Sequence, residues 1–167
     1  GEGQDLCTGG APKALECGGD SLSDPDHIRN WRRLSDQLTT SGQPTEDDLK
    51  QIRALGVKYV INLALHSHED ALSDEAASVK GLDMTYVHIP VEFDNPTDEH
   101  FARFCAAMAD IGDRPVHVHC ILNYRVSAFL YRYRRDVLGV KEDEARAAME
   151  AIWRPGGVWA KFIGDDA

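Results

Sequence analysis

The chain has 167 residues and a mass of 18.5 kDa, the usual size of one domain with its own hydrophobic core. Its 43% hydrophobic and 28% charged residues exclude wholesale disorder and a disulfide-dense miniprotein. A formal net charge of -10 disfavours general binding to nucleic acid or to anionic membrane surfaces, because both would repel the chain. No apolar stretch approaches the ~20 residues that a membrane span needs, so we expect no span.

The start of the chain differs in composition from the rest. It is rich in Gly, Ser and Asp, which predicts a flexible N-terminal arm over residues 1–26 and a single domain over residues 27–167. The absence of an initial Met is expected of a chain whose natural N-terminus, such as a signal peptide, has been removed. Cys7 and Cys17 could close a disulfide, which would favour a periplasmic or secreted location. Two free thiols and a cytoplasmic location are the alternative.

From residue 28 onward, strand signals alternate with helix signals. Residues 28–43 predict one or two edge strands, and Thr45 predicts the start of a helix that ends before Gly56. The nearly continuous apolar run over residues 57–65 predicts a strand buried on both faces. The alternation predicts an α/β fold with a central, mostly parallel sheet flanked by helices. Further along we expect helices over residues 71–80, 101–108, 126–137 and 142–153, strands over residues 84–91 and 115–119, and only a short tail after Pro155.

The chemistry of the chain points to Cys120. It stands at the carboxyl end of a predicted strand, where α/β proteins bind ligands, and a loop leads from it directly into a helix. Free N–H groups at the helix start, together with Arg125, would favour the thiolate and would hold a tetrahedral oxyanion. A thiolate beside a bound phosphate predicts hydrolysis through a phospho-cysteine. The expected phosphate-binding residues are Ile121, Leu122, Asn123, Tyr124, Arg125 and Val126.

The pair His119-Cys120 followed by Arg125 resembles the active-site loop of the protein tyrosine phosphatase superfamily, in its dual-specificity-like branch. Segments within residues 30–44, 57–63 and 86–91 are similar to the bacterial beta-lactamase-hydrolase-like phosphatase subgroup, in similar order and spacing. The match runs from about residue 28 to about residue 155. The resemblance implies a metal-independent phosphatase with Cys120 as nucleophile and Arg125 as phosphate clamp.

The resemblance also implies a general acid, an Asp in an upstream loop that protonates the leaving oxygen. Asp94 is the first choice, because its loop lies between a predicted strand and a predicted helix. Glu92 and Asp98 are close enough in sequence to compete. Asp94 also has a structural interpretation, in which it caps the following helix.

The loop departs from the superfamily pattern in its length. Four residues separate Cys120 from Arg125 where the superfamily usually has five, and Asn123 stands at the usual glycine position. Asn tolerates positive φ better than most residues, so Asn123 is expected to replace that glycine. Ser127 keeps the offset at which the family places a hydroxyl that steadies the leaving thiolate. His119 is expected to hydrogen-bond the backbone around Cys120.

Other functions stay open. A rhodanese-like sulfurtransferase also separates its Cys and Arg by four residues, and a non-catalytic module could keep the phosphate cradle without turnover. A histidine metal site is a further alternative, built from His66, His68, His88, His117 and His119. No carboxylate stands at tight ligand spacing, so we expect no metal and no cofactor, with His117 satisfied inside the sheet. The expected partner is a phosphorylated protein or a small-molecule phosphomonoester, and the sequence leaves the oligomeric state open.

Overall fold

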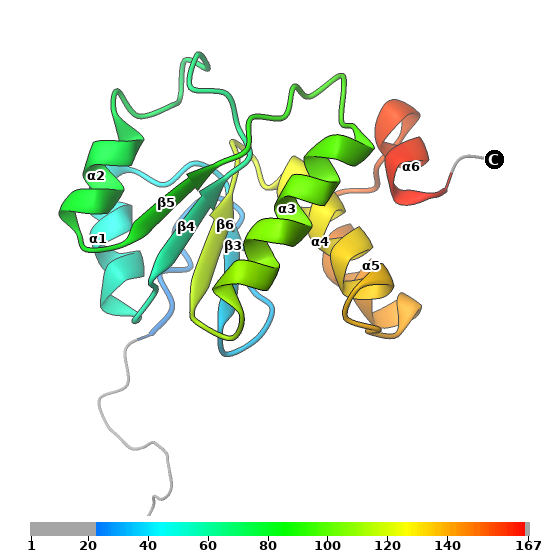
Figure 1. Ribbon diagram of the computed structural model, residues 1–167, viewed down its shortest axis with the longest axis horizontal. Helices are drawn as coiled ribbons and strands as arrows, with labels where there is room; N and C mark the ends of the chain where they lie inside the picture. The colour runs from blue at the N-terminus through cyan, green and yellow to red at the C-terminus, as the bar shows by residue number, and fades with distance from the viewer. Residues whose placement is uncertain (1–22, 166–167) are drawn as a thin grey trace, which may run out of the picture.

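The computed structural model describes residues 23–165 (Figure 1). Cys7, Cys17 and most of the expected arm lie outside the described residues, so the disulfide stays a prediction. At the end of the expected arm, Asp24 accepts hydrogen bonds of 2.8 and 2.7 Å from the guanidinium of Arg33. Within residues 23–165 no helix combines the length and the apolar character needed to cross a membrane.

A five-stranded sheet with the order β2-β3-β6-β4-β5 forms the centre of the molecule. Strands β3, β6, β4 and β5 run parallel to one another, whereas the edge strand β2 pairs antiparallel with β3. The predicted α/β class with a mostly parallel sheet is therefore confirmed. Two strands do form within residues 28–43, but only β2 lies at the edge, because β3 pairs with both β2 and β6. The strands are β2 (Arg32–Arg33), β3 (Leu38–Ser41), β4 (Tyr59–Asn62), β5 (Thr85–His88) and β6 (Val116–His119).

Helices cover both faces of this sheet. Figure 1 shows α1 and α2 on one face and α3, α4, α5 and α6 on the other. Two successive residues of β4 belong to different hydrophobic cores. Val60 lies in the smaller core with Leu49 of α1, and Ile61 lies in the larger core with Phe104 and Phe129. Burial on both faces explains the continuous apolar sequence of this strand. The helices are α1 (Glu46–Ala54), α2 (Glu75–Gly81), α3 (Asp98–Ile111), α4 (Tyr124–Asp136), α5 (Glu142–Glu150) and α6 (Gly157–Ile163).

The starts of α1 and α2 show how capping residues set helix boundaries. Thr45 and the third residue of α1, Asp48, exchange side-chain hydrogen bonds with each other's backbone N–H at 3.0 and 2.9 Å, so the predicted start of α1 is confirmed. The helix expected over residues 71–80 begins only at Glu75, because Asp74 accepts from the N–H of Ala77 at 3.2 Å and caps the helix there. This late start places Glu75 in the first turn of α2, where it is buried.

The prediction of a short tail after Pro155 is wrong, because the segment forms α6. Trp159, Phe162 and Ile163 stand at positions i, i+3 and i+4 and are all buried. The breaker residues do end one helix, but the apolar residues after them have a core to pack against. The indole N–H of Trp159 donates to the carbonyl of Phe93 at 2.6 Å. Helix α6 therefore supports the loop after β5, which borders the candidate active site.

Candidate active site

Cys120 lies where the sequence predicts it, at the carboxyl end of β6 between the parallel neighbours β3 and β4. Helix α4 begins four residues later, at Tyr124. The residue before the helix, Asn123, has φ 69° and is in the left-handed region. Asn123 thus takes the backbone conformation expected of the glycine that it replaces, which lets the shortened loop turn into the helix.

The carbonyl groups of the loop are held away from its centre. Three successive carbonyls each accept a hydrogen bond from a donor outside the loop. Within residues 23–165, none of the backbone N–H groups of residues 121–126 donates to a protein acceptor. These N–H groups remain available to an anion. The three carbonyl contacts are His119 Nδ1 to Cys120 at 3.0 Å, the Gln43 N–H to Ile121 at 3.0 Å and Asn30 Nδ2 to Leu122 at 2.8 Å.

Gly42 lets the segment after β3 approach this loop closely. A Cβ atom at Gly42 would collide with the carbonyl group of Ile121 and press on the side chain of Arg29. The neighbouring Gln43 N–H is the donor that holds the Ile121 carbonyl. A glycine at position 42 is therefore what brings this donor within reach of the loop.

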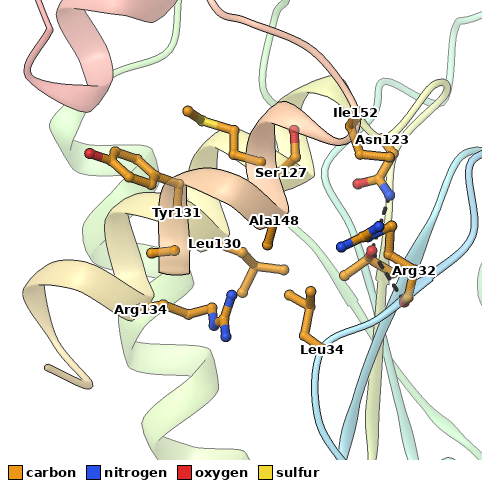
Figure 2. Close-up of a pocket in the computed structure, with 12 residues that line it drawn as sticks. Arg32, Leu34, Asn123, Ser127, Leu130, Tyr131, Arg134, Ala148 and Ile152 are labelled. Carbon is orange, nitrogen blue, oxygen red and sulfur yellow. Dashed lines mark hydrogen bonds between the residues drawn. The ribbon is translucent and has the colours of Figure 1, made fainter. Parts of the chain in front are cut away.

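The loop borders two cavities, and Asn123 lines the smaller one (Figure 2). The Asn123 side chain donates to the Asn30 carbonyl at 2.9 Å and to Thr40 Oγ1 at 3.0 Å. Its own oxygen and the Nε of Arg32 are buried and have no partner within the described residues. The cavity measures about 10 Å³, room for roughly one water molecule bridging two polar groups. The two hydrogen bonds of the Asn123 side chain hold it against β3 and the segment before β2.

Cys120 and Arg125 line one cavity of about 310 Å³. Cys120 is 1% exposed and Arg125 is 8% exposed. One terminal nitrogen of Arg125 donates to the Val91 carbonyl at 3.1 Å, which anchors the guanidinium to the segment after β5. The Nε of Arg125 is buried without a partner among the described residues, so this guanidinium keeps donor capacity for a ligand. Such an unsatisfied buried donor is costly unless a ligand or water pairs with it.

The loop after β5 brings Phe93 to this cavity but leaves Asp94 exposed. Phe93 lines the cavity, and the Arg125 guanidinium lies 5.7 Å from the centre of its ring. Asp94 occupies the same turn and makes no hydrogen bond within residues 23–165. The structural alternative for Asp94 is wrong, because Thr97 caps α3. Asp98 lies in the first turn of α3 and pairs with Arg132 at 3.0 Å.

The supporting residues differ in where their polar atoms point. Ser127 donates its hydroxyl to the carbonyl of Tyr124 at 3.0 Å and borders the smaller cavity, so it makes no hydrogen bond to Cys120. His117 is fully buried and contacts Thr39 and Ser41 hydroxyls, each at 2.8 Å, so it is satisfied inside the sheet. Burial lowers the pKa of His117 well below its usual value. Within residues 23–165 the His, Cys, Asp and Glu side chains form no metal-binding cluster.

Three residues that hold the loop are not identified as site residues by the sequence. Asn30 precedes β2 and Gln43 follows β3, and Glu75 comes from the first turn of α2, where it contacts His119. Asn30 and Gln43 lie inside a segment that resembles the phosphatase subgroup, but the resemblance gives them no role, and Glu75 lies outside every segment that resembles it. The fold brings all three to the loop.

Comparison with known proteins identifies the family. A family model described as "DSP-PTPase phosphatase fused to NAD+ Kinase" matches residues 23–157, most of the chain. The chain belongs to this family. The dual-specificity-like phosphatase fold that the His119-Cys120 loop predicts is thereby confirmed. A search of curated proteins found no match to this chain.

Solved structures agree with this DSP-PTPase assignment. A DUF442 protein from Shewanella putrefaciens, described as a candidate phosphatase, is 34% identical, with a TM-score of 0.75 over 84% of this chain and 92% of that chain. TpbA from P. aeruginosa, solved in complex with pTyr, is 23% identical, with a TM-score of 0.61 over 77% and 75% of the two chains. The catalytic core of the PP-IP phosphatase Siw14 from S. cerevisiae is 11% identical, with a TM-score of 0.68 over 81% and 84%. The last two share the fold.

Proposed function

We propose that the chain hydrolyses a phosphomonoester through a phospho-cysteine on Cys120, without a metal or cofactor. One observation carries the proposal: the buried residue Cys120 shares a cavity with Arg125, whose Nε has no partner among the described residues, beside a loop whose N–H groups are free within those residues. Donors aimed at one point stabilise the equatorial oxygens of a phosphoryl group in the transition state. Membership of a phosphatase family supports the same chemistry.

The reaction divides into two displacements at phosphorus. In the first, the Cys120 thiolate forms a bond to phosphorus while the bond to the leaving oxygen breaks, and Asp94 supplies the proton that this oxygen takes up. Arg125 and the loop N–H groups hold the three remaining oxygens. In the second, water attacks phosphorus and gives a proton to the Asp94 carboxylate. The bond between sulfur and phosphorus breaks, which releases inorganic phosphate and restores the thiolate.

The cavity wall favours a substrate whose organic part is an aromatic ring. Phe93 and Leu122 line the cavity and are 45% and 39% exposed. Tyr124 also lines it and stacks on Trp153, with ring centroids 4.7 Å apart. A ring buried among such side chains gains apolar contact that a sugar phosphate would not. We therefore propose an aryl phosphate, free or as phosphotyrosine in a protein, and the TpbA complex with pTyr supports this choice.

Hydrolysis of p-nitrophenyl phosphate by the full chain, with and without EDTA, tests the proposed function. We expect release of phosphate that EDTA leaves unchanged, since no step uses a metal. Loss of activity with EDTA would contradict the metal-independent mechanism. A parallel assay with thiosulfate and cyanide should form no thiocyanate, because thiocyanate would favour the sulfurtransferase. Binding of inorganic phosphate without any turnover would favour the non-catalytic module.

Asp94→Asn tests the assignment of the general acid. With phenyl phosphate we expect kcat to fall roughly 10²-fold or more, because phenolate leaves slowly without a proton. With p-nitrophenyl phosphate the loss should be smaller, because nitrophenolate is a stable anion. Inhibition by inorganic phosphate should not change, since Asp94 does not hold the anion. Steady-state kinetics on the two substrates provide the measurement.

Asp98→Asn is the matched control for this prediction, because the Asp98 carboxylate pairs with Arg132. Its kcat should equal that of the unchanged protein on both substrates. Equal kcat values for Asp94→Asn and the unchanged protein on phenyl phosphate would remove Asp94 from the mechanism. Glu92 would then be the next residue to replace.

A further inference from the structure

A buried pair of ionisable side chains stands behind the Cys120 loop. Glu75, the first residue of α2, and His119, the last residue of β6, are joined by a contact of 2.5 Å between Oε2 and Nε2. Their side chains are 1% and 0% exposed. Removing two such groups from water costs free energy that a purely apolar pair would not. The phosphatase chemistry proposed above does not by itself use Glu75.

Hydrogen bonding determines the protonation of this pair. His119 Nδ1 lies 3.0 Å from the Cys120 carbonyl, which can only accept, so Nδ1 carries a proton. One further proton lies between Nε2 and the Glu75 carboxylate. The other carboxylate oxygen accepts from Gln43 Nε2 at 3.1 Å. Burial alone would raise the pKa of Glu75, but the charge and hydrogen bond of His119, together with Gln43, hold that pKa below its usual value. The Glu75 carboxylate is therefore ionised at neutral pH.

Other titratable groups face the pair but leave this charge assignment unchanged. Burial lowers the pKa of His88 and His117, so both are neutral at neutral pH, and burial raises the pKa of Tyr86, which keeps its proton. Within the described residues, Glu75 is the only carboxylate that hydrogen-bonds to His119. The facing groups are His66 from the loop after β4, Tyr86 and His88 from β5, and His117 from β6.

We propose that Glu75 is a positioning residue of the Cys120 loop, which acts by keeping His119 protonated. The protonated ring holds the Cys120 carbonyl through Nδ1 and places a positive charge on the residue next to the thiol. Both effects favour the thiolate, since a nearby positive charge stabilises an anion. Gln43 couples the same carboxylate to the loop a second time, because its backbone N–H holds the Ile121 carbonyl. This inference rests on the proposed function only for its catalytic consequence.

The rate at which iodoacetamide alkylates Cys120, measured against pH, tests the proposal. Mass spectrometry of the peptide that contains Cys120 separates its signal from the other cysteines. In Glu75→Gln, His119 loses the partner that keeps it protonated. We expect the pH midpoint of alkylation to rise by about one unit, a tenfold smaller thiolate population below the midpoint. With p-nitrophenyl phosphate at a pH below both midpoints, kcat should fall about tenfold with little change in KM.

Three further variants separate charge from structure. His119→Asn keeps a donor near the Cys120 carbonyl but removes the charge, so its midpoint should rise as in Glu75→Gln. Glu75→Asp keeps the charge and should recover most of the original midpoint. Glu46→Gln is the matched control, because the Glu46 carboxylate accepts from Ser78 at 2.9 Å between α1 and α2 and has no contact with the loop. Its midpoint should not move. Thermal unfolding and circular dichroism identify which variants are folded.

The outcomes distinguish this inference from the proposed function. An unchanged alkylation midpoint in folded Glu75→Gln or folded His119→Asn would overturn the role of Glu75, whatever the phosphatase activity. A raised midpoint in a protein that hydrolyses no aryl phosphate would support the role of Glu75 and contradict the phosphatase. A midpoint that rises equally in Glu75→Asp would show that packing, not charge, is responsible, and would also overturn the proposal.

Discussion

Cys120→Ser should abolish the hydrolysis of aryl phosphates, with kcat for p-nitrophenyl phosphate lowered roughly 10³-fold or more. A serine hydroxyl stays protonated at neutral pH, and the donors around the loop are arranged to stabilise an anion, not to remove a proton. Cys120 is the one thiol among the described residues that line the cavity. Stopped and continuous assays at saturating substrate provide the measurement.

The same variant should still bind phosphate, which separates chemistry from binding. The cradle consists of the loop N–H groups and Arg125, and Cys120→Ser leaves both in place. Calorimetric titration with inorganic phosphate should therefore give an affinity close to that of the unchanged protein. Cys105→Ser is the control, because Cys105 is partly buried on α3 and packs against the core. Equal activity in Cys120→Ser and Cys105→Ser would exclude a phospho-cysteine at position 120.

The sequence is sufficient to predict the part of the site that depends on neighbours along the chain. Cys120, Asn123 and Arg125 lie within six residues, and the pattern of strand, loop and helix around them is local. The left-handed conformation of Asn123 follows from its side chain and from its place before a helix. Such features depend on nearest neighbours and on hydrophobic period, so they are predictable before any tertiary contact is known.

The residues that hold the loop from outside could not be predicted in the same way. From the sequence, Glu75 is expected to be an exposed glutamate in the first turn of a helix, where acidic side chains are common. It is buried only because Asp74 starts α2 late and because the crossover between β4 and β5 brings that turn behind β6. Helix α6 was not predicted, for a related reason. Its three buried apolar residues show a helix only once the core that they pack against is known.

The shortened loop changes what Arg125 must do. With four residues between Cys120 and Arg125, the guanidinium starts from the first turn of α4, and it is fixed by one hydrogen bond to the Val91 carbonyl. Its Nε has no partner among the described residues and faces a buried environment. The side chain therefore links two segments of the site, the Cys120 loop and the loop after β5 that carries Phe93 and Asp94.

Arg125→Lys should lower kcat/KM for p-nitrophenyl phosphate about 10²-fold, although the positive charge is retained. An ammonium is a single point of charge, so it cannot donate to Val91 and offer two parallel donors to phosphate together. We expect both the affinity for inorganic phosphate and kcat to fall, because the clamp acts on bound phosphate and more strongly on the transition state. Arg132→Lys is the control, since Arg132 pairs with Asp98 and stacks on Phe101, 4.1 Å from the ring centre. Equal kcat/KM values for Arg125→Lys and Arg132→Lys would show that a positive charge alone is sufficient at position 125. The loop N–H groups would then have to hold the phosphoryl oxygens without a bidentate guanidinium.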